Sequence, residues 1–216
     1  TLNPAAQLVT GSAGRNNRLL CQSEGVDESH DMVFLNGYHS KAGTPNGLLC
    51  HTLLSLHVCN FRINGEIVGE AAINAAVCGS YGVPVALVTG NSELESEAES
   101  TLPSGFTFCS TKTSIGFSAA ICKTPAKSHA DIRAAAKLAV ANFKQGKLST
   151  LVYDGPVTME VECYKREFTD QACVVAGVEK TGELRFSVSH NSAAECFTLI
   201  WKAMTYGMEE TPWMLR

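Results

Sequence analysis

The fold is decided by residues 31–90, which read DMVFLNGYHSKAGTPNGLLCHTLLSLHVCNFRINGEIVGEAAINAAVCGSYGVPVALVTG. Two apolar runs, 32–35 and 83–89, have the continuous hydrophobicity of strands that are covered on both faces. Between them, residues 69–80 are small and mostly apolar, which is typical of a helix packed closely against a sheet. This order of strand, helix and strand predicts a largely parallel α/β sheet.

The same alternation continues towards the middle of the chain. Residues 106–109 favour a further strand. A helix over residues 128–143 is expected to begin at the capping pair Ser128 and Asp131 and to stop at Gly146. Four acidic residues are expected to lie on the solvated face at the start of another helix: Glu93, Glu95, Glu97 and Glu99.

The character of the chain changes near Lys147. From Val157 onwards, apolar and polar residues alternate, which is typical of half-exposed antiparallel strands. A final helix is expected over residues 192–207. We therefore expect an α/β body over residues 1–147, with a mostly parallel sheet and flanking helices, and a smaller carboxyl-terminal α+β lobe over residues 148–216.

The composition argues against several classes of partner. The net charge of -4, without any cluster of Lys and Arg, argues against binding to nucleic acid or to an anionic membrane. No apolar run reaches the ~20 residues that span a bilayer, and no secretory signal is recognisable at the amino terminus. The nine cysteines include no CxxC pair and lie mostly among apolar neighbours, so we expect reduced thiols in a cytoplasmic protein.

Three side chains of the central stretch are able to bind a metal ion: His39, His51 and Glu70. His39 follows an expected strand at its carboxyl end, which is where ligands collect in open α/β sheets. Catalytic zinc usually takes three ligands from His, Glu, Asp or Cys, and it lowers the pKa of bound water towards ~7. Because a histidine in a loop is more often a surface or structural residue, spacing alone leaves both interpretations of these residues open.

Several short motifs in a defined order connect the chain to a known family. The run NGYHSKAGTPNGLLCHT over residues 36–52, followed by NG, VGE, NAA and YGVPV, resembles the zinc-dependent D-aminopeptidases related to the dipeptide-operon protein DppA. The similarity continues through VTG, STKTSIGFSAA and the last strand and helix, so it covers almost the entire chain. It implies an α/β fold with an α+β lobe, a two-zinc hydrolase of short peptides with amino-terminal D-residues, and a ring-shaped homo-oligomer.

The resemblance also assigns roles to individual residues. It implies that His39 and Glu70 are zinc ligands, and that His51 lies in the catalytic centre as nucleophile or proton-transfer group. Lys112 matches a lysine that is frequent in the family, which suggests a part in the active site or in subunit contacts, beside the alternative of a solvated lysine.

The chain departs from the family pattern at several positions. The family's first strand, with an Asp-x-Glu-Gly metal motif, and a second strand that ends in a metal-binding His would both precede Thr1. We therefore expect a separate amino-terminal fragment, an incomplete sequence, or a shortened relative with a reduced metal site. Asn91 stands where an Asp is common, and Phe117 stands where an Arg is common.

Three functions follow from these observations. The leading hypothesis is a metal-dependent, zinc-containing aminopeptidase-like hydrolase of short peptides. The second is a catalytically reduced, oligomeric binding or structural protein that kept the fold. The third is a hydrolase in which the amino-terminal Thr1 serves as both nucleophile and base.

Overall fold

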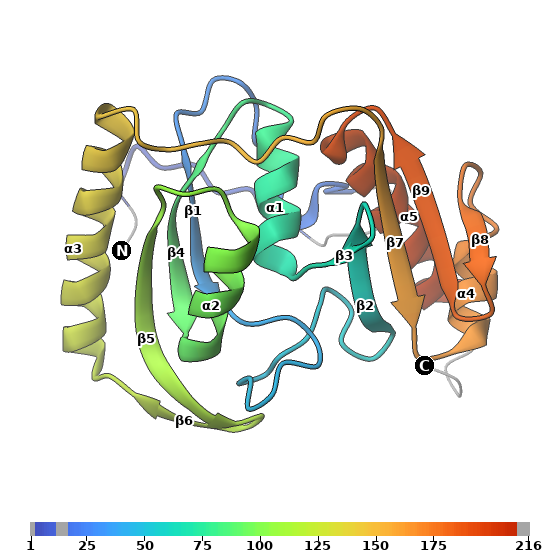
Figure 1. The fold of residues 1–216 in the computed structure, drawn as a ribbon, viewed down its shortest axis with the longest axis horizontal. Helices are drawn as coiled ribbons and strands as arrows, with labels where there is room; N and C mark the ends of the chain where they lie inside the picture. Colours follow the sequence, from blue (N-terminus) through green and yellow to red (C-terminus); the bar gives the residue numbers. More distant parts are fainter. Residues whose placement is uncertain (1–2, 12–16, 211–216) are drawn as a thin grey trace.

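The computed structural model describes residues 3–11 and 17–210, which form two β-sheets around a shared core (Figure 1). The first sheet contains β1 (Val33–Tyr38), β4 (Val85–Asn91), β5 (Thr107–Gly116) and β6 (Ala119–Cys122), in the order β1-β4-β5-β6. The second sheet contains β2 (Val58–Ile63), β3 (Glu66–Ile67), β7 (Val157–Cys163), β8 (Glu179–Gly182) and β9 (Arg185–His190), in the order β3-β2-β7-β9-β8.

The two sheets differ in strand direction. In the first sheet, β1 and β5 both pair with β4 in parallel, and only β6 at its edge is antiparallel. Every pair in the second sheet is antiparallel. The expected α/β class, with a mostly parallel sheet and flanking helices, is therefore confirmed.

Helices pack on both sheets. They are α1 (Glu70–Gly79), α2 (Ser92–Thr101), α3 (Pro125–Lys144), α4 (Arg166–Ala172) and α5 (Ala193–Glu210), with a short 3-10 helix η1 (Cys21–Ser23) before the first strand. No helix within the described residues is both long and apolar enough to cross a bilayer.

Helix α1 lies between the two sheets at the centre of the molecule (Figure 1), and all ten of its residues are buried. Its small side chains allow close approach from both sides. At its end, a Cβ on Gly79 would overlap the carbonyl oxygen of Leu151, so glycine is needed there. The first residue of this buried helix is Glu70, which is thereby held rigidly at the level where β1 ends.

The second sheet takes strands from both sides of Lys147. The hairpin of β2 and β3 precedes this residue, yet β2 pairs with β7, which follows it. One continuous apolar core contains Leu35 of the first sheet, Phe61 of the second and Phe197 of α5. The division of the chain at this residue stays a prediction.

Two helix ends differ from the expected ones. Helix α3 begins at Pro125 with Thr124 as its N-cap, about one turn before Ser128, because proline fits the first helical turn. Helix α5 continues beyond Gly207, where we expected it to stop. That glycine serves packing instead, since a Cβ there would lie 3.0 Å from the carbonyl oxygen of Phe168 in α4.

A charged cluster across β2 and β7 makes the stability of the second sheet pH-dependent. Hydrogen bonds from Asn60, and then from Arg62, hold the pKa of the Glu162 carboxyl below its usual range. A carboxyl with a lowered pKa in the folded state contributes stability above its unfolded pKa, and this contribution is lost as the pH falls through the folded pKa.

We therefore expect Glu162→Gln to lower the free energy of unfolding at neutral pH, by about 1 kcal/mol or less because the group is partly solvated. The difference from the unmodified protein should shrink as the pH falls through the folded pKa of Glu162, as measured by urea denaturation at several pH values. Glu66→Gln, at an exposed position in β3, is the matched control. A deficit that stays constant down to acid pH would contradict this account.

Candidate metal centre

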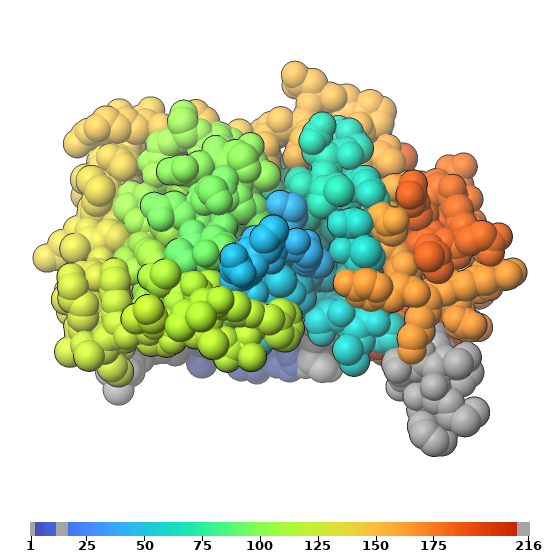
Figure 2. Space-filling view, turned by 60° about the horizontal axis from the view of Figure 1, so that its bottom comes forward, coloured from blue at the N-terminus to red at the C-terminus, as the bar shows by residue number. Residues whose placement is uncertain are grey.

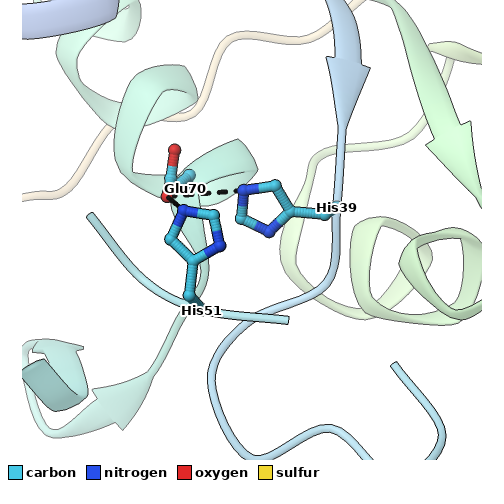
Figure 3. A group of neighbouring side chains, drawn as sticks. All are labelled: His39, His51 and Glu70. Carbon is cyan, nitrogen blue, oxygen red and sulfur yellow. Dashed lines mark ion pairs between the residues drawn. The ribbon is translucent and has the colours of Figure 1, made fainter. Parts of the chain in front are cut away.

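His39, His51 and Glu70 come from three separate elements and meet at one point (Figure 3). His39 directly follows β1, His51 lies in the loop between β1 and β2, and Glu70 is the first residue of α1. One possible ligand atom from each lies within 4.8 Å of the others. The loop after β1, coloured blue in Figure 2, lies at the surface between the yellow-green β5–β6 hairpin and the cyan β2 region.

The two imidazoles approach the carboxylate from the same side. The Nε2 atom of His39 and the Nε2 atom of His51 each lie 3.6 Å from Glu70 Oε1. The rings are stacked, with centroids 4.0 Å apart and an interplanar angle of 20°. The side chain of Glu70 is 4% exposed, whereas those of His39 and His51 are 20% and 33% exposed, so the site opens to solvent on its histidine side.

Backbone carbonyl groups fix the outer nitrogen of each ring. His39 Nδ1 lies 3.0 Å from the carbonyl oxygen of Ser40. His51 Nδ1 lies 2.7 Å from that of Leu49. A carbonyl oxygen only accepts hydrogen bonds, so in a neutral ring the proton is on Nδ1 and the lone pair is on Nε2. Both lone pairs therefore point towards Glu70, as in metal sites where a second hydrogen bond fixes the tautomer.

This donor set suits a divalent cation. The two Nε2 lone pairs face a carboxylate, so this point is electron-rich and no hydrogen-bond donor lies between the rings and the carboxylate. Protonation of both rings would not relieve this favourably, because it would place two positive charges in stacked rings. Zinc bonds to N and O ligands of ~2.0–2.2 Å in tetrahedral geometry imply ligand atoms about 3.4 Å apart. The two separations from Nε2 to Glu70 Oε1, both 3.6 Å, match that value closely, and all three ligand atoms lie within 4.8 Å of one another. The three residues therefore fit a zinc ion.

Two residues that the sequence did not single out hold the carboxylate of Glu70. The backbone N–H of Leu53 donates to Glu70 Oε1 at 2.8 Å, and Gln22 Nε2 donates a short hydrogen bond to Oε2. Asn74 in turn donates to Gln22 Oε1 at 3.2 Å, which orients the amide. Gln22 lies in a polar segment without periodicity, and Leu53 acts through its backbone, so neither had a signal in the sequence.

A second buried carboxylate lies beside the start of α1. Glu97 is 6% exposed, so our expectation of a solvated side chain was wrong for this residue. Its Oε2 atom accepts from the backbone N–H of Lys41 at 2.7 Å, and Lys41 Nζ lies 3.9 Å away. Burial raises the pKa of this carboxyl. A Cβ on Gly69 would overlap Glu97 Oε1 and lie 3.0 Å from Lys41 Cβ, so a side chain at this position would displace the Glu97 carboxylate.

Burial also affects the phenol of Tyr38, next to His39. It raises the pKa of Tyr38, and the charge of Glu70 adds to the effect. In the adjacent strand, a Cβ on Gly90 would overlap the carbonyl oxygen of Tyr38, so glycine permits the close approach of β1 and β4 that places His39. The close approach of β1 and β4 at Tyr38 thus fixes the point at which His39 enters the site.

The two family departures at Asn91 and Phe117 both support the loop that carries His51. Asn91 Oδ1 accepts from Leu94 N at 3.1 Å as the N-cap of α2, and Asn91 Nδ2 donates to the carbonyl oxygen of Leu48 at 3.2 Å. A carboxylate could cap the helix but could not donate to a carbonyl. The carbonyl oxygen of Phe117 accepts from the N–H of Leu49 at 2.7 Å.

The structure does not test two other expectations from the sequence. Lys112 lies on β5 in register with Asn91, and its role stays a prediction. Thr1 lies outside the described residues.

Comparisons with known proteins agree on one family. The profile of Peptidase_M55, described as D-aminopeptidase, matches residues 1–202. A curated D-aminopeptidase of Bacillus subtilis (strain 168) is 36% identical over 127 residues, which make up 59% of this chain and 44% of that relative. The chain thus spans less than half the length of this curated relative. A solved structure described as the Zn-dependent D-aminopeptidase DppA from Bacillus subtilis, a self-compartmentalizing protease, superposes with a TM-score of 0.85 at 28% identity. The match covers 98% of this chain and 74% of that one.

Proposed function

The chain belongs to the D-aminopeptidase family Peptidase_M55, and from this premise we propose that it acts as a metal-dependent aminopeptidase on short peptides, including peptides that begin with a D-residue. The observation that carries the proposal is the convergence of His39, His51 and Glu70 with both Nε2 lone pairs directed at the carboxylate. The relatives with zinc dependence and D-aminopeptidase activity support it.

We assign His39 and Glu70 as zinc ligands. Glu70 is buried and held by two hydrogen bonds, so little rearrangement is needed for it to receive a cation. When bound, zinc would supply Lewis acidity towards a peptide carbonyl and towards water. This cofactor assignment rests on the chemistry of the donor set and on the solved relative.

His51 is the proposed catalytic group. Its Nδ1–H is held by the carbonyl oxygen of Leu49, which leaves Nε2 free to accept and return a proton. Its side chain is one-third exposed and is the most accessible of the three, so a peptide amino terminus is able to reach it from solvent. Glu70 on the buried side would stabilise the imidazolium that forms.

Further parts of the proposal concern assembly and compartment. We propose a homo-oligomer, ring-shaped as the resemblance implies, because the solved relative is described as self-compartmentalizing. All nine cysteines are free thiols, which supports a cytoplasmic location. A separate amino-terminal fragment stays a prediction, and an intact-mass measurement of the purified preparation tests it.

Removal of metal tests the function directly. The purified protein is expected to contain zinc by elemental mass spectrometry and to release D-alanine from a D-alanyl anilide or dipeptide faster than L-alanine from the L-form. Chelation followed by desalting should lower this activity by at least about 10-fold, and added zinc should restore it. Absence of both zinc and activity would instead favour the catalytically reduced relative. Activity that survives chelation but is lost in Thr1→Ala would favour the threonine hydrolase.

A further inference from the structure

Two leucines on either side of His51 have left-handed backbone conformations. Leu49 has φ 49° and Leu53 has φ 59°. Left-handed conformations are uncommon for residues other than glycine because the Cβ atom crowds the backbone, and Asn, Asp and His are enriched among the exceptions. Such strain persists only where surrounding contacts enforce it, and it concentrates at functional sites. Both leucines have contacts of this kind.

The backbone of Leu49 is held at both of its polar groups. Its N–H donates to the carbonyl oxygen of Phe117, at the tip of the β5–β6 hairpin, at 2.7 Å. Its carbonyl oxygen accepts from His51 Nδ1, also at 2.7 Å. The preceding carbonyl, that of Leu48, accepts from the buried Asn91 side chain. The left-handed turn at Leu49 therefore links the hairpin to the histidine ring through a single residue.

The backbone of Leu53 serves the other side of the site. Its N–H donates to Glu70 Oε1 at 2.8 Å, the same oxygen that faces both imidazoles. Its side chain is partly buried against the main apolar core, which anchors the end of the loop. The two leucines thus each give one backbone group to one side chain of the metal centre.

We propose that Leu49 and Leu53 are positioning residues, whose left-handed conformations aim the carbonyl of Leu49 at His51 Nδ1 and the N–H of Leu53 at Glu70 Oε1. An ordinary helical or extended conformation at either residue would turn these peptide groups away from the site. The Nδ1 tautomer of His51 then depends on the β5–β6 hairpin through the Phe117 carbonyl. The benefit of this positioning rests on the proposed function. The backbone geometry at the two leucines, however, can be tested without zinc or substrate.

Leu49→Val is the informative variant because a β-branched residue strongly disfavours φ near 49°, whereas Leu49→Gly accepts it and keeps both peptide groups. Asn46→Val is the matched control. Asn46 is exposed in the same loop with φ 56°, so its valine variant carries a similar backbone penalty away from the site. All variants are made in the full chain and compared with the unmodified protein.

The first measurement is the tautomer of His51 in metal-free, ¹⁵N-histidine-labelled protein. We expect a protonated Nδ1 in the unmodified protein, Leu49→Gly and Asn46→Val, and a mixture of tautomers in Leu49→Val. The second measurement is the zinc dissociation constant in competition with a chelator. Leu49→Val should leave zinc binding unchanged, because it acts through His51, which is not assigned as a ligand, and it should lower peptidase turnover instead. Leu53→Val should weaken zinc binding by about 10-fold to 100-fold, the range for residues that orient metal ligands, without changing the His51 tautomer.

The outcomes separate this inference from the proposed function. A Leu49→Val protein whose His51 tautomer and turnover equal those of Asn46→Val overturns the inference, and so does a Leu53→Val protein whose zinc affinity equals that of Asn46→Val. If the unmodified protein binds no zinc, the proposed function fails, while the tautomer comparison still decides on Leu49. Should Leu49→Val not fold, Leu49→Thr, whose β-branch also disfavours φ near 49°, is judged by the His51 tautomer and by turnover, and unchanged values again count against the proposal.

Discussion

Glu70→Gln is expected to bind no zinc at the centre and to lose more than about 100-fold in peptidase turnover, which is beyond the range for residues that merely orient ligands. The amide has no charge to balance a divalent cation. It also cannot accept from both Leu53 N–H and Gln22 Nε2, since one of its two terminal atoms is itself a donor. Elemental analysis after dialysis against zinc buffer, with D-alanyl substrate kinetics, measures both effects.

The stability of the Glu70→Gln variant separates a ligand from a structural residue. Without metal, the carboxylate faces two nitrogen lone pairs and is 4% exposed, so an amide that donates to one of them offsets part of the hydrogen bond that it loses from Leu53 N–H or Gln22 Nε2. We expect the metal-free variant to unfold at a denaturant concentration close to or slightly below that of the metal-free parent. Glu97→Gln, at another buried glutamate, is the control and should keep zinc. A Glu70→Gln protein that retains zinc would contradict our assignment.

Alanine substitutions are expected to show that His39 and His51 have different roles. His39→Ala should lose zinc and activity together, because it removes a ligand. His51→Ala should keep zinc while turnover falls by about 100-fold to 10,000-fold, the range for loss of a general acid–base group. The structure places both Nε2 atoms at the same 3.6 Å from Glu70 Oε1, so the division of roles comes from the family resemblance and needs this test.

Metal content and kinetics of the two alanine variants provide the readout. His30→Ala, an exposed histidine paired with Asp27, is the control for losing an imidazole as such. If His51→Ala also loses zinc, then His51 is a third ligand, and the proton-transfer role must pass to another group. If His39→Ala keeps zinc at full occupancy, our assignment of His39 as a ligand is wrong.

Much of the fold could be predicted because its signals are local. The unbroken apolar runs became β1 and β4, the small-residue segment became α1, and Asn64 and Gly65 form the turn between β2 and β3. The errors arose where a local signal has two explanations. Gly207 appeared to be a helix stop but is a packing residue against α4, and Glu97 appeared to be solvated but is buried beside Gly69.

The sequence by itself indicated the fold class, the family and the three candidate site side chains, because periodicity, turn residues and motif order are written along a short stretch of chain. Only the tertiary structure decided how those side chains are held. Gln22 reaches Glu70 across 48 residues, and Leu53 reaches it across 17. The proton positions of His39 and His51 depend on which carbonyl groups face their rings. Such contacts leave no local pattern, since they depend on where distant backbone atoms come to lie after the core has packed.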